Sequence, residues 1–309
     1  MSSTVAYKDS TASDYLEAIR KHIQSNDNKN TSAENFTPTF IKPVTSKISL
    51  ANAFTHTQKT LGDYDVVDNT GKLVAYLPFD LDPLDASNDN HGTWTGTETY
   101  VDGPEINEDK HRKAADFDGA SYLTLANESN FDREHNQPFS ICGWIKTTTS
   151  ATMMIWAKDN TAGSVDNGFW IYWNDSVGQI IFGLDTGSGG SQTFFQMGFT
   201  IAITDGLWRH LCCTFSGNSN RNGMKMYVDG VLVATGAAGA ISESILNNVP
   251  LVIGADSDGS LPFTGQMSQV QFWNVELVQA DVTDIVSGKQ INKDTAATNP
   301  GIISLTDVK

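Results

Sequence analysis

The chain has 309 residues, of which 39% are hydrophobic and 10% are aromatic, and its formal net charge at pH 7 is −16. Such an acidic surface repels nucleic acid and anionic lipid, and we expect neither as a partner. Neutral glycans, cations and basic protein surfaces remain compatible with it. The sequence contains no run of about 18 apolar residues and therefore predicts no membrane span.

The N-terminus shows no secretory signal. The first residues, MSSTVAYKDSTASDYLEAIRKH, lack a basic segment followed by an apolar stretch, which is the pattern of a signal peptide. We therefore expect the chain to be made in the cytoplasm, and either to act there or to leave within a particle released by lysis.

Residues 1–72 are predicted to form an extended N-terminal arm that carries one short helix. The arm is rich in Ser, Thr, Asn, Asp and Lys, so it cannot offset the entropy of ordering by itself. Ser13 can cap a helix over residues 13–25, whose apolar stripe at helical spacing consists of Leu16, Ile19 and Ile23. Because so short a helix is unstable alone, we predict that the stripe packs against the rest of the chain or binds another protein subunit.

From residue 73 onward the sequence changes to short apolar or alternating runs separated by turn residues. About a dozen such runs without intervening helices indicate an all-β sandwich or barrel. Asp229-Gly230 predicts a two-residue hairpin turn. One short helix is expected over 276–287, ended by Gly288, and 289–309 reads as a polar C-terminal tail. The predicted strands are 73–79, 120–125, 139–146, 153–157, 169–173, 179–184, 194–203, 207–215, 224–228, 231–235, 250–255 and 266–273.

Six segments in this region occur in a recognisable order, namely LVAYLPFD, AADFDGASYLTL, FSICGWIK, GLWRHLCCTF, MKMYVDGVLVA and the stretch from LVIGADSDG to VQFWN. In this order and spacing, residues 73–288 resemble the laminin G-like and pentraxin branch of the concanavalin A-like lectin/glucanase superfamily. The resemblance implies a two-sheet antiparallel jelly-roll sandwich. We expect its core to contain Phe117, Trp144, Trp208 and Tyr227, since they lie in alternating strands.

The sequence predicts that the domain is not an enzyme. Glucanases on this fold need two facing carboxylates, and their usual E-x-D-x-E strand does not occur here. The six histidines are scattered, with no metalloprotease spacing, and there is no phosphate-binding loop or nucleophile-elbow motif.

A calcium site is one binding hypothesis, because many relatives hold calcium at the rim of the sandwich. Asp256 and Asp258 precede Gly259, so their carboxylates can converge on one hard cation. Asp80, Asp82, Asp85 and Asp89 form a second acidic cluster. Against calcium, Ser268 stands where the resemblance implies an acidic residue. The alternative is that these acidic loops are simply solvated.

A glycan site is the other binding hypothesis. Trp170, Tyr172 and Trp173 follow a polar loop, and aromatic rings stack on the apolar faces of sugars while loop amides and carboxylates bond their hydroxyls. The alternative is that Trp170 and Tyr172 fill the core and Trp173 covers a strand edge.

The three cysteines, Cys142, Cys212 and Cys213, do not have the spacing of a disulfide framework or a zinc ribbon. Cys212 and Cys213 are neighbours in one predicted strand and should point to opposite faces. We expect inert free thiols, at least one of them buried, which suits a reducing compartment.

Two functional hypotheses remain. In the first, the arm anchors the chain to a larger assembly, for which a virus or phage particle is one candidate, and the acidic sandwich is displayed outward as a decoration or attachment protein. Residues 1–72 carry eight basic and eight acidic residues, so the whole net charge of −16 lies in residues 73–309. In the second, the chain is a free glycan-binding lectin, and its arm is only a linker.

Overall fold

The computed structural model describes residues 72–106, 112–159, 167–188 and 191–288. The predicted arm with its helix 13–25 and stripe Leu16, Ile19 and Ile23, and the predicted tail 289–309, lie outside the described residues. None of the helices in the described residues is long and apolar enough to cross a membrane.

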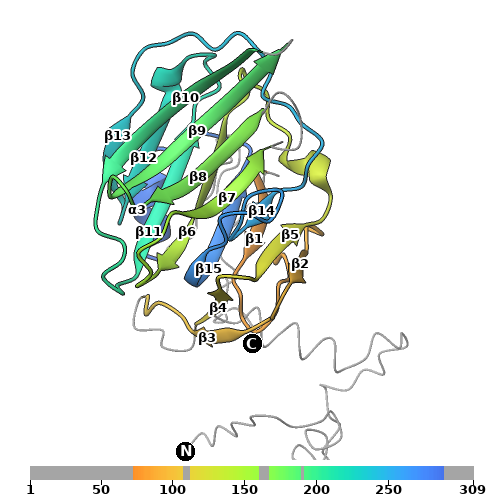
Figure 1. The fold of residues 1–309 in the computed structure, drawn as a ribbon, viewed down its shortest axis with the longest axis vertical. Coiled ribbons are helices and arrows are strands. Elements are labelled where there is room, and N and C mark those ends of the chain that lie inside the picture. Colours follow the sequence, from red (N-terminus) through yellow and green to blue (C-terminus); the bar gives the residue numbers. More distant parts are fainter. Residues whose placement is uncertain (1–71, 107–111, 160–166, 189–190, 289–309) are drawn as a thin grey trace, which may run out of the picture. The chain divides into compact units, whose positions relative to one another are not determined.

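The described chain forms two antiparallel sheets packed face to face, which confirms the predicted jelly-roll sandwich (Figure 1). One sheet has eight strands in the order β13-β12-β11-β6-β15-β4-β3, with β1 also paired to β15. Its strands are β1 (Leu73–Leu77), β3 (Tyr100–Asp102), β4 (Lys113–Asp118), β6 (Phe139–Lys146), β11 (Arg209–Phe215), β12 (Met224–Val228), β13 (Val231–Thr235) and β15 (Thr264–Trp273).

The other sheet has seven strands in the order β10-β9-β8-β7-β14-β5-β2. They are β2 (Gly92–Thr95), β5 (Tyr122–Leu125), β7 (Met153–Asp159), β8 (Gly168–Asn174), β9 (Gln179–Ser188), β10 (Ser191–Thr200) and β14 (Val252–Ile253). The short helices η2 (Glu128–Phe131), η3 (Arg221–Gly223) and α3 (Gln279–Val286) complete the fold.

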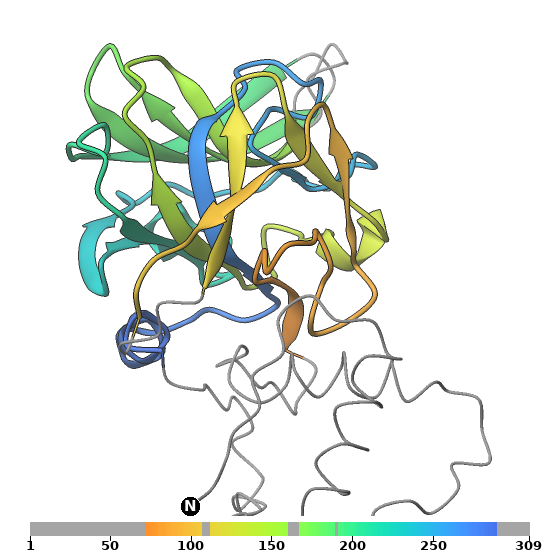
Figure 2. The ribbon, with the colours of Figure 1, turned by 90° about the horizontal axis from the view of Figure 1, so that it is seen from below.

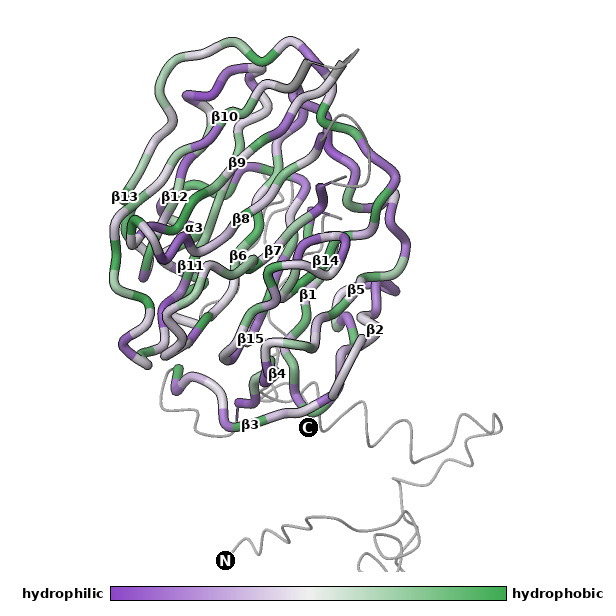
Figure 3. Tube along the Cα trace, in the orientation of Figure 1, coloured by the Kyte–Doolittle hydropathy of each residue, from purple (hydrophilic) through white to green (hydrophobic). Residues whose placement is uncertain are grey.

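The main core fills the space between the two sheets. Alternate residues of each strand point inward, as the period of two of a strand requires, and green stretches along the central strands mark these apolar runs (Figure 3). At the centre, the ring of Phe272 stacks on Phe139 at 6.0 Å and on Phe169 at 5.9 Å between centroids. Phe117 is buried in this core, as predicted.

Helix α3 lies on the outer side of the eight-stranded sheet (Figure 2). A second apolar cluster joins residues of this helix to the outer face of the sheet. Tyr227 is buried there against Leu277, Val282 and Ile285 rather than between the sheets. This corrects the prediction that places Tyr227 in the main core. The physical reason is that α3 provides a second apolar cover, so both faces of β12 are buried.

The predictions for Trp144 and Trp208 are also corrected. Both are only partly buried and belong to neither core cluster. The ring of Trp144 packs edge-on against His210, with centroids 5.3 Å apart, and the Nζ of Lys146 lies 5.7 Å from the ring centroid of Trp208. Trp144 thus points to the outer face of its sheet and Trp208 precedes β11, so neither ring fills the space between the sheets.

Most element boundaries agree with the sequence to within a few residues, and β6, β12 and β13 agree to the residue. Asp229 and Gly230 both have positive φ, 49° and 82°, which confirms the predicted hairpin turn. Strands β2 and β3 are absent from the prediction because their sequences, GTWT and YVD, are short and partly polar. Strand β4 is expected only through Phe117 and the segment AADFDGASYLTL, without bounds.

Candidate functional site

The outer face of the seven-stranded sheet carries the aromatic residues that the sequence singles out. The strand register places Tyr172 opposite Ile181 and Met154, and Trp170 opposite Gly183 and Ala157. These side chains form a cluster separate from the main core. Trp170 and Tyr172 therefore lie side by side on this outer face, with ring centroids 5.1 Å apart and planes at 51°.

Trp170 is locked in position by its neighbours. Its Nε1 donates a hydrogen bond of 2.7 Å to Oδ2 of Asp185, a buried carboxylate. A Cβ on Gly183 would come within 2.2 Å of the indole, so the ring lies directly over this glycine. Only 8% of Trp170 is exposed. The indole thus supports the outer face, while the half-buried Tyr172 presents ring surface to solvent.

The structure corrects the place of Trp173 in the predicted glycan site. Its side chain is 3% exposed and belongs to the main core between the sheets. Alternation along β8 explains this, since Phe169, Ile171 and Trp173 point inward and Trp170 and Tyr172 point outward. The alternative reading in which Trp170 and Tyr172 fill the core and Trp173 covers a strand edge therefore has the two faces reversed.

Sequence reasoning missed two residues of this face, Phe194 and Gln196. Phe194 pairs with Asp185, and Gln196 pairs with Gly183. Both are exposed, Phe194 by 54%. Phe194 is opposite Asp185 of β9, and Tyr172 is opposite Ile181 of the same strand. These two β9 residues are four positions apart, which is about 13 Å along the strand. Between Tyr172 and Phe194 the surface is formed by Gly183, the edge of Trp170 and the amide of Gln196. The face therefore offers an aromatic ring near each end and a polar group between them.

Two buried carboxylates lie in one row of this face. Asp159 of β7 and Asp185 of β9 both pair with Gly168 of β8. Their backbones are two strand spacings apart, which is roughly 10 Å. The pair is invisible in the sequence because it depends on the register of three strands. Asp185 is engaged by the Trp170 indole, so its position serves the aromatic cluster.

Asp256 and Asp258 lie in a tight turn rather than in a ring of ligands. A carboxylate oxygen of Asp256 accepts the N–H of Ser257 at 2.7 Å, and one of Asp258 accepts the N–H of Ser260 at 2.8 Å. Hydrogen bonds from the hydroxyl and the N–H of Ser260 lower the pKa of Asp258. Within the described ranges, no group of three or more His, Cys, Asp or Glu side chains could hold a metal ion.

Calcium takes six to eight oxygen ligands, and the two carboxylates of this turn already bind their own backbone. One oxygen of each carboxylate thus already serves the turn, and the described residues add no third carboxylate or histidine ligand beside them. Calcium binding stays a prediction from the sequence, to be tested by titration with the ion.

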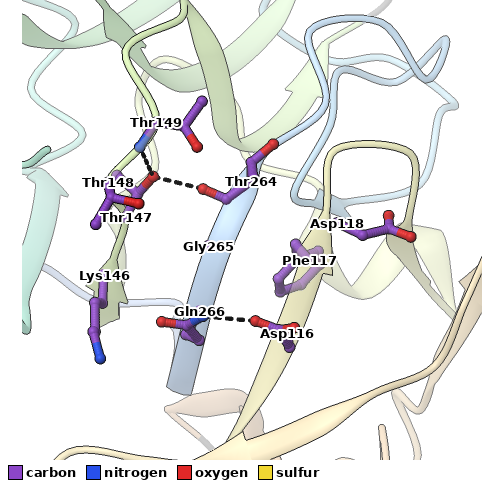
Figure 4. Close-up of a pocket in the computed structure, with 10 residues that line it drawn as sticks. All are labelled: Asp116, Phe117, Asp118, Lys146, Thr147, Thr148, Thr149, Thr264, Gly265 and Gln266. Atoms are coloured by element: carbon purple, nitrogen blue, oxygen red, sulfur yellow. Dashed lines mark hydrogen bonds between the residues drawn. The ribbon is translucent and has the colours of Figure 1, made fainter. Parts of the chain in front are cut away.

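A polar pocket of about 400 Å³ opens where β4 and β6 end and β15 begins (Figure 4). Its polar groups bind one another. Nε2 of Gln266 donates to Asp116 at 2.7 Å, and Oγ1 of Thr147 donates to the carbonyl oxygen of Thr264 at 2.6 Å. The aromatic residue in its lining, Phe117, is buried in the core. The pocket therefore offers a ligand no ring face.

A second pocket, of about 460 Å³, is rich in asparagine and also lacks an aromatic lining. Its amides are occupied within the protein. Nδ2 of Asn88 and Nδ2 of Asn90 both donate to the carbonyl oxygen of Val74, and Nδ2 of Asn130 donates to Oδ1 of Asn90. Of the described surfaces, the outer face of the seven-stranded sheet is therefore the better candidate for a binding site.

Comparison with known proteins places this geometry in context. A model of the family described as the concanavalin A-like lectin/glucanases superfamily matches residues 117–283. Human pentraxin-4 (Homo sapiens) is 27% identical over 162 residues, which are 49% of this chain and 31% of that protein. The chain thus covers about a third of the length of this relative.

Two solved structures share the fold. The binding domain of Paraclostridial Mosquitocidal Protein 1 aligns with a TM-score of 0.53 and 16% identity, covering 70% of this chain and 52% of that one. The receptor binding domain of botulinum neurotoxin C/D mosaic serotype aligns with a TM-score of 0.50 and 14% identity, covering 70% and 51%. At these identities the likeness concerns the fold alone.

Proposed function

Since this chain belongs to the concanavalin A-like lectin/glucanases superfamily, we propose that its sandwich is a non-catalytic domain that binds a neutral oligosaccharide. The binding surface is the outer face of the seven-stranded sheet, around Tyr172, Phe194 and Gln196. The observation that carries the proposal is the fixed pair Trp170 and Tyr172, turned outward and braced by the hydrogen bond from Trp170 to Asp185.

The chemistry of this face suits a sugar chain. Aromatic rings stack on the apolar C–H faces of pyranose or furanose rings, while amides and carboxylates bond hydroxyl groups. Tyr172 and Phe194 are separated by about 13 Å along the strand direction, which suits an oligosaccharide better than a single sugar. The two solved structures with the same fold are named as binding domains, which supports a binding role.

Charge favours an uncharged ligand. The net charge of the chain is −16, and Asp159 and Asp185 both lie on this face. A sialylated or sulfated glycan would approach carboxylates here, and like charges repel at short range.

The domain is proposed to bind without hydrolysing. A retaining glycosidase holds its two carboxyl groups at about 5–5.5 Å, and an inverting one at about 6.5–9.5 Å, with one of them protonated. Of the two buried carboxylates on this face, Asp159 is 4% exposed and Asp185 is bound to the Trp170 indole at 2.7 Å. A carboxylate held in this way braces the ring and does not reach a substrate as a nucleophile.

The proposal is tested by screening the chain against a panel of neutral and acidic oligosaccharides, followed by calorimetric titration of the best ligand. Tyr172→Ala should weaken binding about tenfold or more, equivalent to about 1.4 kcal/mol. Trp208→Ala, which removes a partly exposed aromatic beside the other sheet, is the matched control and should bind like the wild type. A Trp208 variant that loses binding while the Tyr172 variant keeps it would place the site elsewhere. Turnover of the ligand would contradict the non-catalytic role.

We also propose that residues 1–72 anchor the sandwich to a larger assembly, such as a virus or phage particle, through the stripe Leu16, Ile19 and Ile23. The support is the sequence alone, namely an arm of zero net charge whose predicted helix lacks a core of its own. A free glycan-binding lectin is the other reading. The two differ in what the arm contacts, and the truncation described below separates them.

A further inference from the structure

Three cysteines lie in the described residues, all of them buried free thiols. Two of them face each other across neighbouring strands. Cys142 of β6 is the register partner of Cys212 of β11, and both belong to the apolar cluster beneath α3. Cys213 points the other way, into the core between the sheets. The two adjacent cysteines thus point to opposite faces, as predicted.

The hydrogen-bond pattern defines the kind of pair that Cys142 and Cys212 form. The N–H of Asp229, just after β12, donates to the carbonyl oxygen of His210 in β11 at 2.8 Å. The N–H of Ser216, just after β11, donates to the carbonyl oxygen of Gly223, just before β12, at 3.1 Å. Even-numbered residues of β11 therefore direct their backbone groups toward β12. In an antiparallel sheet such residues form non-hydrogen-bonded pairs with the strand on their other side. Cys212 and Cys142 are such a pair.

This pairing brings the two cysteines into disulfide range. Opposed residues of a non-hydrogen-bonded pair have Cα atoms about 4.5 Å apart, their side chains on the same face. A disulfide accepts Cα separations of about 4.4–6.8 Å. We propose that Cys142 and Cys212 are a latent cross-strand disulfide, which forms when a small-molecule disulfide such as oxidised glutathione reaches them. The bond would join β6 and β11, two central strands of the eight-stranded sheet.

The reaction is a thiol–disulfide exchange in two steps. The sulfur of Cys142 attacks one sulfur of the small disulfide, forms a mixed disulfide and releases one small thiol. The sulfur of Cys212 then attacks Sγ of Cys142 and releases the second small thiol. Two electrons pass from the cysteines to the small disulfide, and the two protons that the cysteines lose appear on the released thiols.

The surroundings favour Cys142 as the first nucleophile. Burial raises the pKa of its thiol, but the neighbouring Cys212 thiol and the His210 imidazole stabilise its thiolate and lower the pKa to about 6. Burial and the neighbouring Cys142 raise the pKa of Cys212. The acidic member of the pair is the better nucleophile near neutral pH, because only the thiolate attacks.

Helix α3 controls access to the pair. Val282 and Ile285 of α3 and the preceding Leu277 pack in the same cluster as the two thiols, and both cysteines are fully buried. A mixed disulfide with glutathione does not fit under this cover, so α3 must lift first. Helix α3 has eight residues, and an element of this size opens at a lower free energy than the whole domain unfolds.

The experiment incubates the full chain with oxidised glutathione and counts free thiols by mass spectrometry after alkylation. The wild type should lose two thiols and keep one. Because Cys212 and Cys213 are adjacent in the chain, they fall in the same proteolytic peptide, and a variant is needed to tell which of them is bonded to Cys142. Cys213→Ala should still form the intramolecular disulfide. Cys212→Ala and Cys142→Ala should form none. The oxidised wild type should melt higher by roughly 5–10 °C, the gain expected from closing a long loop.

The rate of oxidation provides a second test, which does not depend on the cysteine variants folding. Ile285→Ala loosens the contact of α3 with the cluster and should speed disulfide formation several-fold, whereas Val278→Ala, an exposed residue just before α3, should not. The proposal fails if Cys213 takes part in the disulfide, or if three thiols persist in the Ile285 variant after prolonged oxidation.

Discussion

At the residue scale, the sequence identifies the aromatic strand of the site but not the face that each ring occupies. The run FWIYW is apolar throughout, and alternation alone states only that Trp170 and Tyr172 share one face and Phe169, Ile171 and Trp173 the other. Which set faces the opposite sheet depends on the tertiary packing of both sheets. Phe194 and Asp185 could not be assigned to the site because they meet only through the register of β9 and β10.

The glycines of this face lead to a prediction. A Cβ at position 183 would meet the Trp170 ring at 2.2 Å, so Gly183→Ala should displace the indole and break its hydrogen bond to Asp185. Overpacking of this kind costs about 1–3 kcal/mol, measurable by urea denaturation, and the displaced ring should also weaken oligosaccharide binding.

The matched control lies on the neighbouring strand of the same face. At Gly198 the added Cβ meets Oε1 of Gln179, the movable end of a side chain. Gly198→Ala should therefore change the free energy of unfolding by less than about 1 kcal/mol. Equal losses of stability in the two variants would show that the indole is not held over Gly183 as described.

At the element scale, long apolar strands are predicted well and short polar ones are not. β6, with the sequence FSICGWIK, has the predicted bounds, whereas β2 and β3 are recognised only through their pairing partners β5 and β4. Loops are the least predictable, because distant side chains hold them. Nζ of Lys158, for example, binds Glu128 at 2.6 Å, Asp132 at 2.9 Å and the carbonyl oxygen of Val249 at 2.8 Å.

Glu134 holds a loop in the same way and predicts a pH dependence. Its carboxylate accepts the hydroxyl of Ser244 at 2.6 Å and the N–H of Ile245 at 3.1 Å. Burial raises the pKa of Glu134, but these hydrogen bonds and the N–H of His135 outweigh it, so the pKa lies below its usual 4.5. The native state then binds its proton less readily than the unfolded chain, so the stabilisation is present above pH 4.5 and is lost as the pH falls below it.

Glu134→Gln should accordingly lower the melting temperature at neutral pH. Below about pH 4.5 the melting temperature of this variant should fall less steeply with pH than that of the wild type. Thermal melts between neutral and acidic pH measure both effects. The exposed Glu243, in the loop that Glu134 contacts, provides the control, and Glu243→Gln should follow the wild-type curve. If the melting temperature of the Glu134 variant fell below pH 4.5 as steeply as that of the wild type, the loss of stability would not come from Glu134.

At the scale of the whole molecule, the sandwich described by residues 72–288 has its own core, which makes the arm testable by deletion. A chain starting at Leu73 should fold with a melting temperature close to that of the full chain. If the arm is an anchor, the shortened chain should lose incorporation into the assembly, because it lacks the stripe Leu16, Ile19 and Ile23 that is proposed to bind the partner.

Ile19→Asp in the full chain should have nearly the same effect, since it would bury a carboxylate without a counter-charge. Copurification of tagged full-length and shortened chains with the assembly measures incorporation. Normal incorporation of both variants would leave the free lectin as the better reading. In each case glycan binding by the sandwich should be retained, so the two proposals stand or fall separately.

The first and last strands of the sandwich also determine how the domain can be connected to other chains. The N–H of Asn274 donates to the carbonyl oxygen of Lys72 at 2.9 Å, and Leu73 shares an apolar cluster with Val282 and Ile285 of α3. The start of β1 is thus tied to the end of β15, whereas the end of α3 lies over the turn between β12 and β13, where a Cβ on Gly230 would meet Val286 and Thr283. These two ends of the described sandwich lie at different points along the outer side of the eight-stranded sheet, away from the outward aromatic face of the other sheet. A partner fused at either end would therefore leave the aromatic face unobstructed.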